Sequence, residues 1–203
     1  CKSKGIWDNT YLFIVSDHGF APSPKKVNLG RLLVEKDFIK FNQEQKVVDW
    51  DAYAITNGGN AFLYVNESKK DTPSANADTA TRLLQLFNSL ASTPGSGIDR
   101  VITPDEIRER HGDPKAVFAI AASPGHAFSP SFGGSSAVYT GGSVGHHGFP
   151  EQSEAMQASL LIVGPGIEKK QIAKAHLVDI APTVAKILGL VAPAHAGKKL
   201  LNP

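Results

Sequence analysis

The chain has 203 residues, of which 41% are hydrophobic and 20% are charged, so it is long enough to bury one sizeable core and we expect a single domain over residues 1–203. Its net charge of +2, with acids and bases interspersed, argues against the basic surface of a nucleic-acid-binding protein. No apolar run approaches the roughly 18 residues needed to span a bilayer, and the single cysteine, Cys1, excludes an internal disulfide.

The chain begins abruptly. Residues 1–5 contain neither an initiator methionine nor an apolar signal core, and they lead at once into an apolar segment. We therefore expect the sequence to be a fragment, or to lack residues that precede Cys1.

Three short, continuous apolar runs indicate strands that are buried on both faces, as in a parallel sheet covered by helices. They are residues 11–15, 116–122 and 159–163. Residues 52–55 and 61–65 flank the sequence Asn57-Gly58-Gly59-Asn60, a pattern that predicts strand, turn and strand.

Helical patterns separate these strands. Residues 75–90 form an amphipathic pattern, and residues 103–106 resemble a capped helix start with proline at its first position. Asp179 is expected to cap a last helix that runs through Leu188 and stops at Gly189. With a short strand over 98–102 and mixed helix and strand signals over 27–41, the chain is predicted to be an α/β protein.

The first candidate site is Ser16-Asp17-His18-Gly19, which directly follows the strand over 11–15. Open α/β sheets bind ligands at the carboxyl ends of their strands, and a carboxylate beside an imidazole suits zinc or a similar divalent metal. The alternative is an ordinary turn in which His18 is a surface histidine, and the residues alone leave both readings open.

The second candidate is Gly145-His146-His147-Gly148, at the end of a polar segment over 123–148 that is too long for a simple connection. One of the two histidines could ligate a metal, and the other could be a bystander or a substrate contact. A flexible glycine loop with two exposed histidines explains the pattern equally well.

Other polar residues carry weaker signals. Asn57 and Asn60 could touch a substrate, but a hairpin turn explains them better. His126 could line the pocket or be an ordinary loop histidine. The lysine pairs at 25–26 and 169–170 are expected to be solvated surface charge.

Taken together, these segments resemble the alkaline phosphatase superfamily, and most closely the carboxy-terminal half of its type I phosphodiesterase/nucleotide pyrophosphatase branch. Five motifs in order carry the resemblance over nearly the whole chain: YLFIVSDHG at 11–19, SPGHAF at 123–128, GHHGF at 145–149, LLIVGPGI at 160–167, and VDIAPTVA at 178–185 followed by Leu188-Gly189.

The resemblance implies an alkaline-phosphatase-like fold, with a mixed, mainly parallel sheet between helices that is incomplete at its N-terminus. It also implies two divalent metal ions, usually zinc. Asp17 and His18 would bind one ion and His147 the other. His146 falls at a variable position of the motif and is kept as a substrate contact, together with His126.

The resemblance further implies that the nucleophile and additional ligands lie upstream of Ser-Asp-His-Gly, where only sixteen residues precede Asp17. No catalytic residue is therefore assigned, and these 203 residues alone are expected to be nearly inactive. The complete protein would hydrolyse phosphodiester or pyrophosphate bonds in small, nucleotide-type phosphate esters.

Three alternatives stay open: a sulfatase, phosphonate hydrolase, phosphomutase or phosphomonoesterase of the same superfamily; a non-catalytic metal- or ligand-binding relic; and an α/β interaction domain without metal. The residues do not determine the compartment, although the resemblance suggests a periplasmic or secreted protein.

Overall fold

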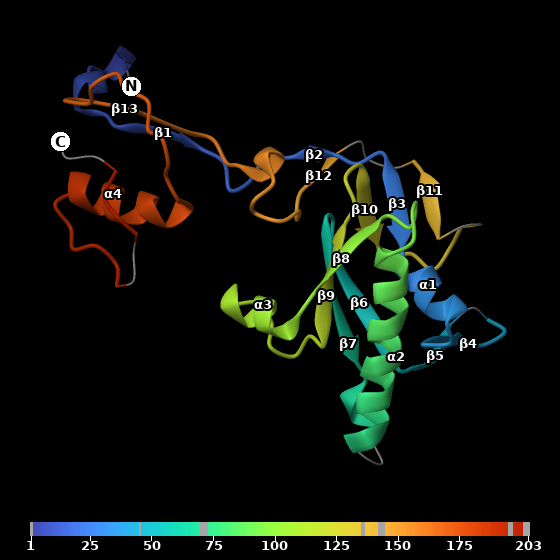
Figure 1. The fold of residues 1–203 in the computed structure, drawn as a ribbon. Helices are drawn as coiled ribbons and strands as arrows, with labels where there is room; N and C mark the ends of the chain where they lie inside the picture. Colours follow the sequence, from blue (N-terminus) through green and yellow to red (C-terminus); the bar gives the residue numbers. More distant parts are fainter. Residues whose placement is uncertain are drawn as a thin grey trace. The chain divides into compact units, whose positions relative to one another are not determined.

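The structure is a computed structural model that describes residues 2–44, 46–69, 73–134, 137–141, 145–194 and 197–200. The contacts within the chain concentrate in two units, and the expectation of a single domain over residues 1–203 stays a prediction. The first unit comprises residues 1–18 and 158–203, and the second comprises residues 19–157. Figure 1 labels the helices and strands of both units.

The centre of the second unit is a four-stranded sheet in the order β6-β7-β9-β8. Its strands are β6 (Ala52–Asn57), β7 (Asn60–Val65), β9 (Phe118–Ala122) and β8 (Ile98–Ile102), and all neighbours are antiparallel. Asn57 pairs with Asn60 across the turn, which confirms the predicted hairpin. All five residues of β9 are buried, as its apolar run predicted.

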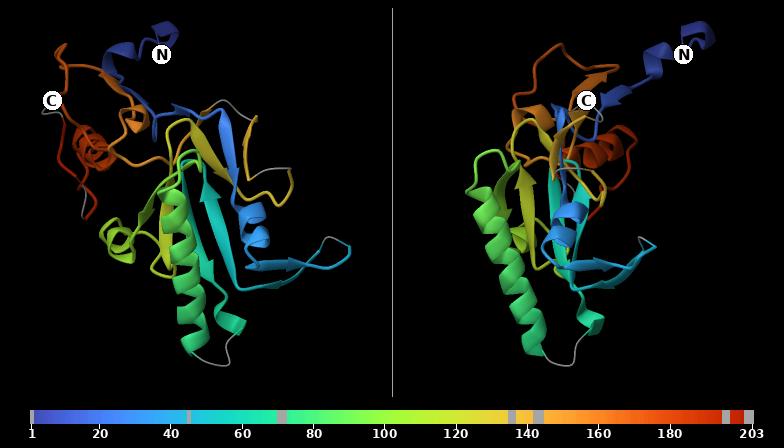
Figure 2. Two further views of the ribbon diagram at one scale, coloured as in Figure 1. Left: turned by 45° about the vertical axis from the view of Figure 1, so that its right-hand side comes forward. Right: turned by 90° about the vertical axis from the view of Figure 1, so that its right-hand side faces the viewer.

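Helix α2 (Pro73–Ala91) covers one face of this sheet (Figures 1 and 2). Its spacing of apolar residues places Leu83 and Phe87 in the core, where both are fully buried. The ring of Phe87 meets that of Phe118 edge-on at 5.8 Å. Helix α3 (Pro104–Glu109) begins with a complete capping box between Thr103 and Glu106, so the predicted helix start is confirmed.

A smaller sheet of the second unit has the order β10-β3-β11. Strand β3 (Lys25–Asn28) pairs in parallel with β10 (His126–Ser129) and antiparallel with β11 (Val138–Thr140). The remaining elements of this unit are α1 (Leu29–Glu35), the pair β4 (Ile39–Phe41) and β5 (Val47–Trp50), the pair β2 (Ala21–Pro22) and β12 (Gly145–His146), and the 3-10 turns η3 (Glu67–Lys69) and η4 (Glu154–Met156).

In the first unit, β1 (Leu12–Val15) pairs antiparallel with β13 (Leu160–Val163). The unit also contains the turns η1 (Lys2–Lys4), η2 (Trp7–Asn9) and η5 (Leu177–Asp179) and the helix α4 (Ile180–Ile187). Gly189, at φ +66°, ends α4 as predicted. The buried Asp179 carboxylate makes no cap bond to α4. It accepts instead from the backbone N–H groups of His176 and Lys198, at 2.9 and 2.8 Å.

Two expectations about the sheets differ from the structure. Among the described strands only β3 and β10 pair in parallel, because hairpins and other antiparallel pairings supply the rest. The predicted strands β1 and β13 are present, but their expected burial on both faces is wrong: Ile14 and Leu161, which pair with each other, are each 54% exposed. An apolar run of this kind predicts that other elements cover both faces of the strand. Among the described residues of the first unit, β1 and β13 pair only with each other.

No helix in the described part of the chain has both the length and the apolar character that a bilayer span requires.

Candidate functional site

The turn between β6 and β7 contacts the segment 145–149, which we call the histidine loop. The backbone N–H of Gly59 donates to the carbonyl oxygen of His147 at 2.8 Å, and the side-chain amide of Asn60 donates to that of Gly148 at 2.7 Å. The turn also binds the sheets beneath it, since Gly58 and Gly59 accept from the backbone N–H groups of Phe128 and Ala122 at 2.7 and 2.8 Å. The turn therefore fixes the histidine loop to two strands of the second unit.

His147 is oriented by the same turn. Its Nε2 atom lies 3.1 Å from the amide oxygen of Asn57. Because an amide oxygen can only accept, Nε2 carries the proton in this contact, and Nδ1 becomes the ring nitrogen suited to ligation. This is the arrangement by which a neighbouring polar group commonly fixes the tautomer of a metal-binding histidine. The sequence favoured a hairpin role for Asn57 over a substrate contact and did not indicate this contact, which spans 90 residues of sequence.

Gly148 allows the loop to approach the turn so closely. Its φ is +80°, a conformation that favours glycine, and a Cβ atom there would lie 1.9 Å from the carbonyl oxygen of Asn57. The glycine on the C-terminal side of the two histidines is thus required by the contact that positions His147.

His146 faces a lysine. The Nζ atom of Lys26, on β3, contacts Nε2 of His146, on β12. Lys26 is only 7% exposed, so the expectation that it is solvated surface charge is wrong. Burial lowers the pKa of the Lys26 ammonium, and burial together with the charges of Lys26 and His147 lowers the pKa of His146.

Asp17 and His18 lie at the end of β1 in the first unit. The backbone N–H of His18 donates to Oδ1 of Asp17 at 3.1 Å, and Nε2 of His18 lies 3.4 Å from Oδ2. Ser16 extends the pairing of β1 with β13 by two hydrogen bonds to Ser159. Its backbone N–H donates to the carbonyl oxygen of Ser159, and its hydroxyl oxygen accepts from the backbone N–H of Ser159. Both predicted ligand side chains are solvent-accessible, at 84% for Asp17 and 40% for His18, so an ion in solution can reach them.

His126 occupies a different environment. It is buried at the start of β10, its Nδ1 atom lies 3.1 Å from the carbonyl oxygen of Pro124, and its ring lies against Gly97. The structure therefore places His126 in the packing between β10 and the loop before β8, and its expected role as a substrate contact stays a prediction.

Asp17 and His18 belong to the first unit, and His146, His147 and His126 belong to the second. Across the described ranges, no three or more His, Cys, Asp or Glu side chains are gathered into a group that could hold a metal ion. The joint two-metal site implied by the resemblance stays a prediction.

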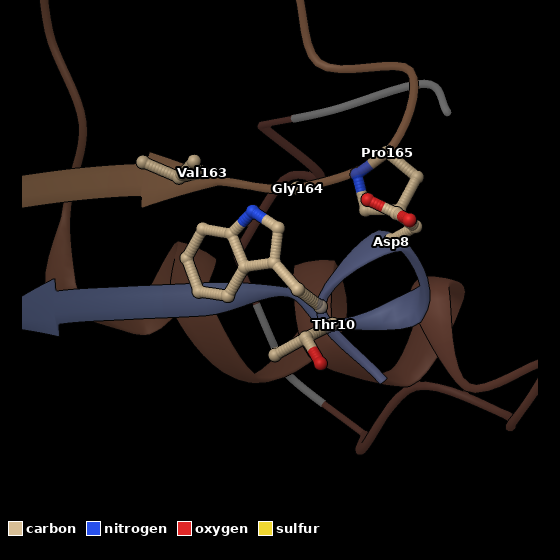
Figure 3. A pocket seen from close by; sticks show the side chains of 6 residues that line it. Asp8, Thr10, Val163, Gly164 and Pro165 are labelled. Atoms are coloured by element: carbon tan, nitrogen blue, oxygen red, sulfur yellow. The ribbon is translucent and has the colours of Figure 1, made fainter. Parts of the chain in front are cut away.

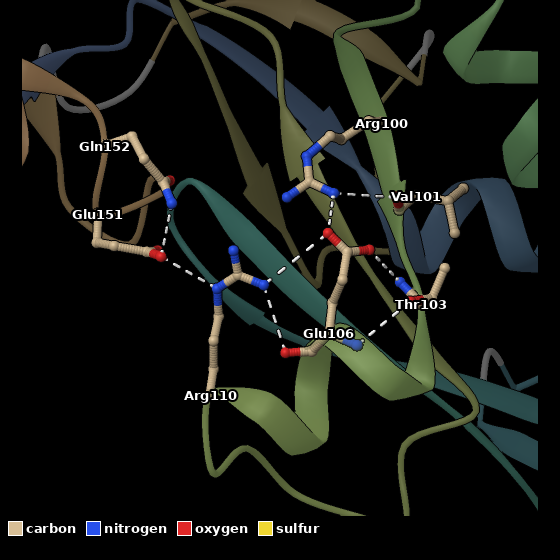
Figure 4. Close-up of polar contacts among 7 residues, drawn as sticks. All are labelled: Arg100, Val101, Thr103, Glu106, Arg110, Glu151 and Gln152. Atoms are coloured by element: carbon tan, nitrogen blue, oxygen red, sulfur yellow. Dashed lines mark hydrogen bonds and ion pairs between the residues drawn. The ribbon is translucent and has the colours of Figure 1, made fainter.

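An ionic network holds the segment that follows the histidine loop (Figure 4). Arg110 donates through Nε to Glu151 at 3.1 Å, and Glu106 accepts from Arg100 at 2.8 Å. The backbone N–H of Thr103 and then Arg100 hold the pKa of Glu106 below its usual value. These side chains are partly exposed to solvent, so each pair contributes at most about 1 kcal/mol, and we assign the network a supporting role.

The first unit contains a cavity of about 230 Å³ between the segment before β1 and the end of β13 (Figure 3). Its lining residues are Trp7, Asp8, Thr10, Val163, Gly164 and Pro165. With one carboxylate and no histidine, this lining offers a poorer donor set for zinc than Asp17 with His18.

Residues 1–150 match the family described as type I phosphodiesterase / nucleotide pyrophosphatase. The match covers the Asp17-His18 pair and the histidine loop. The chain belongs to this family. The predicted family is thereby confirmed, and with it the alkaline phosphatase superfamily.

Solved structures support the fold of this type I phosphodiesterase family member. Murine ectonucleotide pyrophosphatase/phosphodiesterase 5, in an inactive form in complex with AMP, matches with a TM-score of 0.62 and 20% identity, over 97% of this chain and 45% of that one. The human protein of the same name matches with a TM-score of 0.62 and 18% identity over the same shares. These likenesses establish the mixed α/β fold, and the chain spans less than half of the length of either protein.

Phosphonoacetate hydrolase from Sinorhizobium meliloti 1021 shows a weaker likeness, with a TM-score of 0.48 and 14% identity over 85% of this chain and 40% of that one. A search among curated proteins found no match.

Proposed function

We propose that the protein is a metal-dependent hydrolase of phosphodiester or pyrophosphate bonds in small, nucleotide-type substrates, and that these residues form the carboxy-terminal portion of its catalytic domain. The observation that carries the proposal is the family match over residues 1–150, because that range includes every proposed metal ligand. The murine relative in complex with AMP is consistent with a small nucleotide ligand.

The donor set fits divalent metals. Asp17 offers carboxylate oxygens beside the imidazole of His18, and both are accessible. His147 offers a ring whose orientation is fixed by Asn57. Zinc is commonly coordinated by carboxylate oxygen and imidazole nitrogen atoms. In the proposal, Asp17 and His18 hold one ion and His147 holds a second. When bound, two such ions would activate a nucleophile and stabilise the phosphoryl or leaving oxygen.

The residues of this chain have defined tasks in the proposal. Asn57 keeps the proton on Nε2 of His147, and the backbone contacts of Gly59 and Asn60 keep the histidine loop in place. His146 contacts the substrate. We assign no nucleophile within the 203 residues, so the chain alone is expected to bind metal but to hydrolyse phosphodiesters far more slowly than a complete enzyme.

Metal binding is tested by a zinc titration of the metal-free protein in a calorimeter. The proposal expects tight, stoichiometric binding that His147→Ala weakens strongly. His111→Asn is the matched control, because His111 lies in the turn after α3, at a positive φ that asparagine tolerates, and it should bind zinc like the unmodified protein. Weak binding that is equally insensitive to both substitutions would remove the metal-site assignment.

The reaction class is tested with p-nitrophenyl esters on a protein that also contains the segment expected to supply the nucleophile. Hydrolysis of a phosphodiester in preference to a phosphomonoester and a sulfate ester is expected, with loss of activity in Asp17→Asn. Preference for the sulfate ester would instead identify a sulfatase. Tight zinc binding without any hydrolysis would favour the non-catalytic relic.

A further inference from the structure

Lys26 is a buried lysine whose identified polar partner is a histidine. It lies in the middle of β3, paired with β10 on one side and β11 on the other, and only 7% of its surface is accessible. Its ammonium contacts Nε2 of His146, the residue directly before the proposed metal ligand His147. A cationic group is thus held at the histidine loop by strands of the same unit.

The surroundings of Lys26 differ from those of two more exposed lysines that have acidic partners, Lys69 and Lys46. Lys69 lies 2.5 and 2.6 Å from the carboxylates of Asp49 and Asp51, and Lys46 lies 2.9 Å from Glu44. Lys26 forms no ion pair with an acidic side chain of the described residues. Burying an ammonium without a counter-charge is unfavourable, so the site is arranged for an anion that the described side chains do not provide.

We propose that Lys26, together with His146, binds the anionic phosphoryl oxygens of the substrate at the histidine loop. This inference rests on the proposed function and adds to it a named cation for the phosphate. A phosphoryl oxygen supplies the missing negative charge, and charge-assisted hydrogen bonds from an ammonium to a phosphate are among the stronger hydrogen bonds in proteins. Lys26 would act as a point charge that selects an anionic group rather than a particular base or sugar.

The test measures binding of two probes, AMP and inorganic phosphate, to the zinc-loaded protein by calorimetry. Lys26→Met should weaken both at least about tenfold, as expected for loss of a hydrogen bond to a charged group. Lys26→Arg should retain part of the affinity. Lys25→Met is the matched control, since Lys25 is the exposed neighbour on the same strand, and it should bind like the unmodified protein. Equal affinities for Lys26→Met and the unmodified protein would overturn the inference.

Unfolding of the same variants separates binding from a purely structural role. Methionine replaces a buried charge by an apolar side chain of similar length, so Lys26→Met should be at least as stable as the unmodified protein while binding the probes more weakly. Parallel losses of stability and affinity would assign Lys26 to the fold instead. If Lys26→Met does not fold, His146→Gln carries the same test, and unchanged probe affinity in that variant would refute the paired role.

The outcomes also distinguish this inference from the proposed function. A protein that hydrolyses phosphodiesters, with the same KM in the unmodified form and in Lys26→Met, keeps the proposed function and loses the inference. A complete protein that neither hydrolyses phosphodiesters nor binds either probe loses both.

Discussion

The contact between the histidine loop and the β6–β7 turn can be tested by adding a single methyl group at Gly148. In Gly148→Ala the new Cβ atom would lie 1.9 Å from the carbonyl oxygen of Asn57, whereas real Cβ contacts essentially never fall below 3.0 Å. The loop must therefore move away by 1 Å or more, which breaks the hydrogen bonds of 2.7 and 2.8 Å that join Gly148 and His147 to the turn.

The cost has two parts. A non-glycine residue at φ +80° costs about 1 kcal/mol. The two lost hydrogen bonds contribute about 0.5–1.5 kcal/mol each. We expect Gly148→Ala to lower the free energy of unfolding by about 2–4 kcal/mol. Gly95→Ala is the matched control, because Gly95 has the same φ of +80° in the same unit and its Cβ would meet no atom within 4 Å. That variant should lose only about 1 kcal/mol.

Urea unfolding followed by tryptophan fluorescence measures the difference. The chain has two tryptophans, Trp7 in the first unit and Trp50 in the second. In a Trp7→Phe background, Trp50 therefore reports on the unit that contains the loop. Equal losses of stability in the two glycine variants would refute the reasoning, since they would show that the close contact at Gly148 carries no energy beyond the backbone conformation.

Three further predictions concern residues elsewhere in the second unit. Asn57→Ala should weaken zinc binding about 10–100-fold, as substitutions of groups that orient metal ligands typically do, and Asn57→Asp should restore much of it, as read by calorimetry. Burial and the hydrogen bond to Asp113 raise the pKa of Tyr64 to about 12. Because that pKa is raised in the folded state, the hydroxyl stabilises the fold fully below about pH 10, and this stabilisation is lost as the pH rises towards 12. The urea midpoint of the unmodified protein should therefore fall between pH 10 and pH 12, and that of Tyr64→Phe should fall less. Phe87→Ala should lower the free energy of unfolding in urea by about 3–5 kcal/mol. Leu84→Ala, at a side chain that is 39% exposed, should lower it by about 1 kcal/mol or less. Equal losses of stability in the two variants would contradict the packing of α2 against the sheet.

Much of the second unit could be predicted from local patterns. The Asn-Gly-Gly-Asn hairpin, the α2 pattern and the Thr103-Pro104 helix start each depend on neighbouring residues, and each is present in the structure. Strand burial was less predictable. All five residues of β9 are buried, since strands pair with both of its edges and α2 packs on it through Phe87 and Phe118. The strand β1 has the same apolar character, but it pairs with one strand only and is largely exposed. Hydrophobicity indicates that a strand should be covered, and the neighbours that cover it are set by the tertiary fold.

The candidate site shows a similar division. The proposed ligands Asp17, His18 and His147 could be predicted from the sequence, because each lies in a short local motif. The side chains that contact the two histidines could not be predicted in this way, because Asn57 and His147 are 90 residues apart in the sequence and Lys26 and His146 are 120 residues apart. Lys26 was interpreted as surface charge because a lysine is rarely buried without a partner, and it is this departure from the ordinary pattern that now identifies it as a candidate anion-binding group.

These contacts also separate stability from ligand binding in a way that can be checked. Gly148 acts through backbone contacts that hold the loop, so its substitution should lower the free energy of unfolding and the zinc affinity together. The exposed Asn57 side chain contributes one hydrogen bond to a ring, so Asn57→Ala should lower zinc affinity with less than about 1 kcal/mol of lost stability. If instead Gly148→Ala destabilised the protein without changing zinc affinity, His147 would be held by something other than this turn, and the assignment of Asn57 as its positioning residue would be wrong.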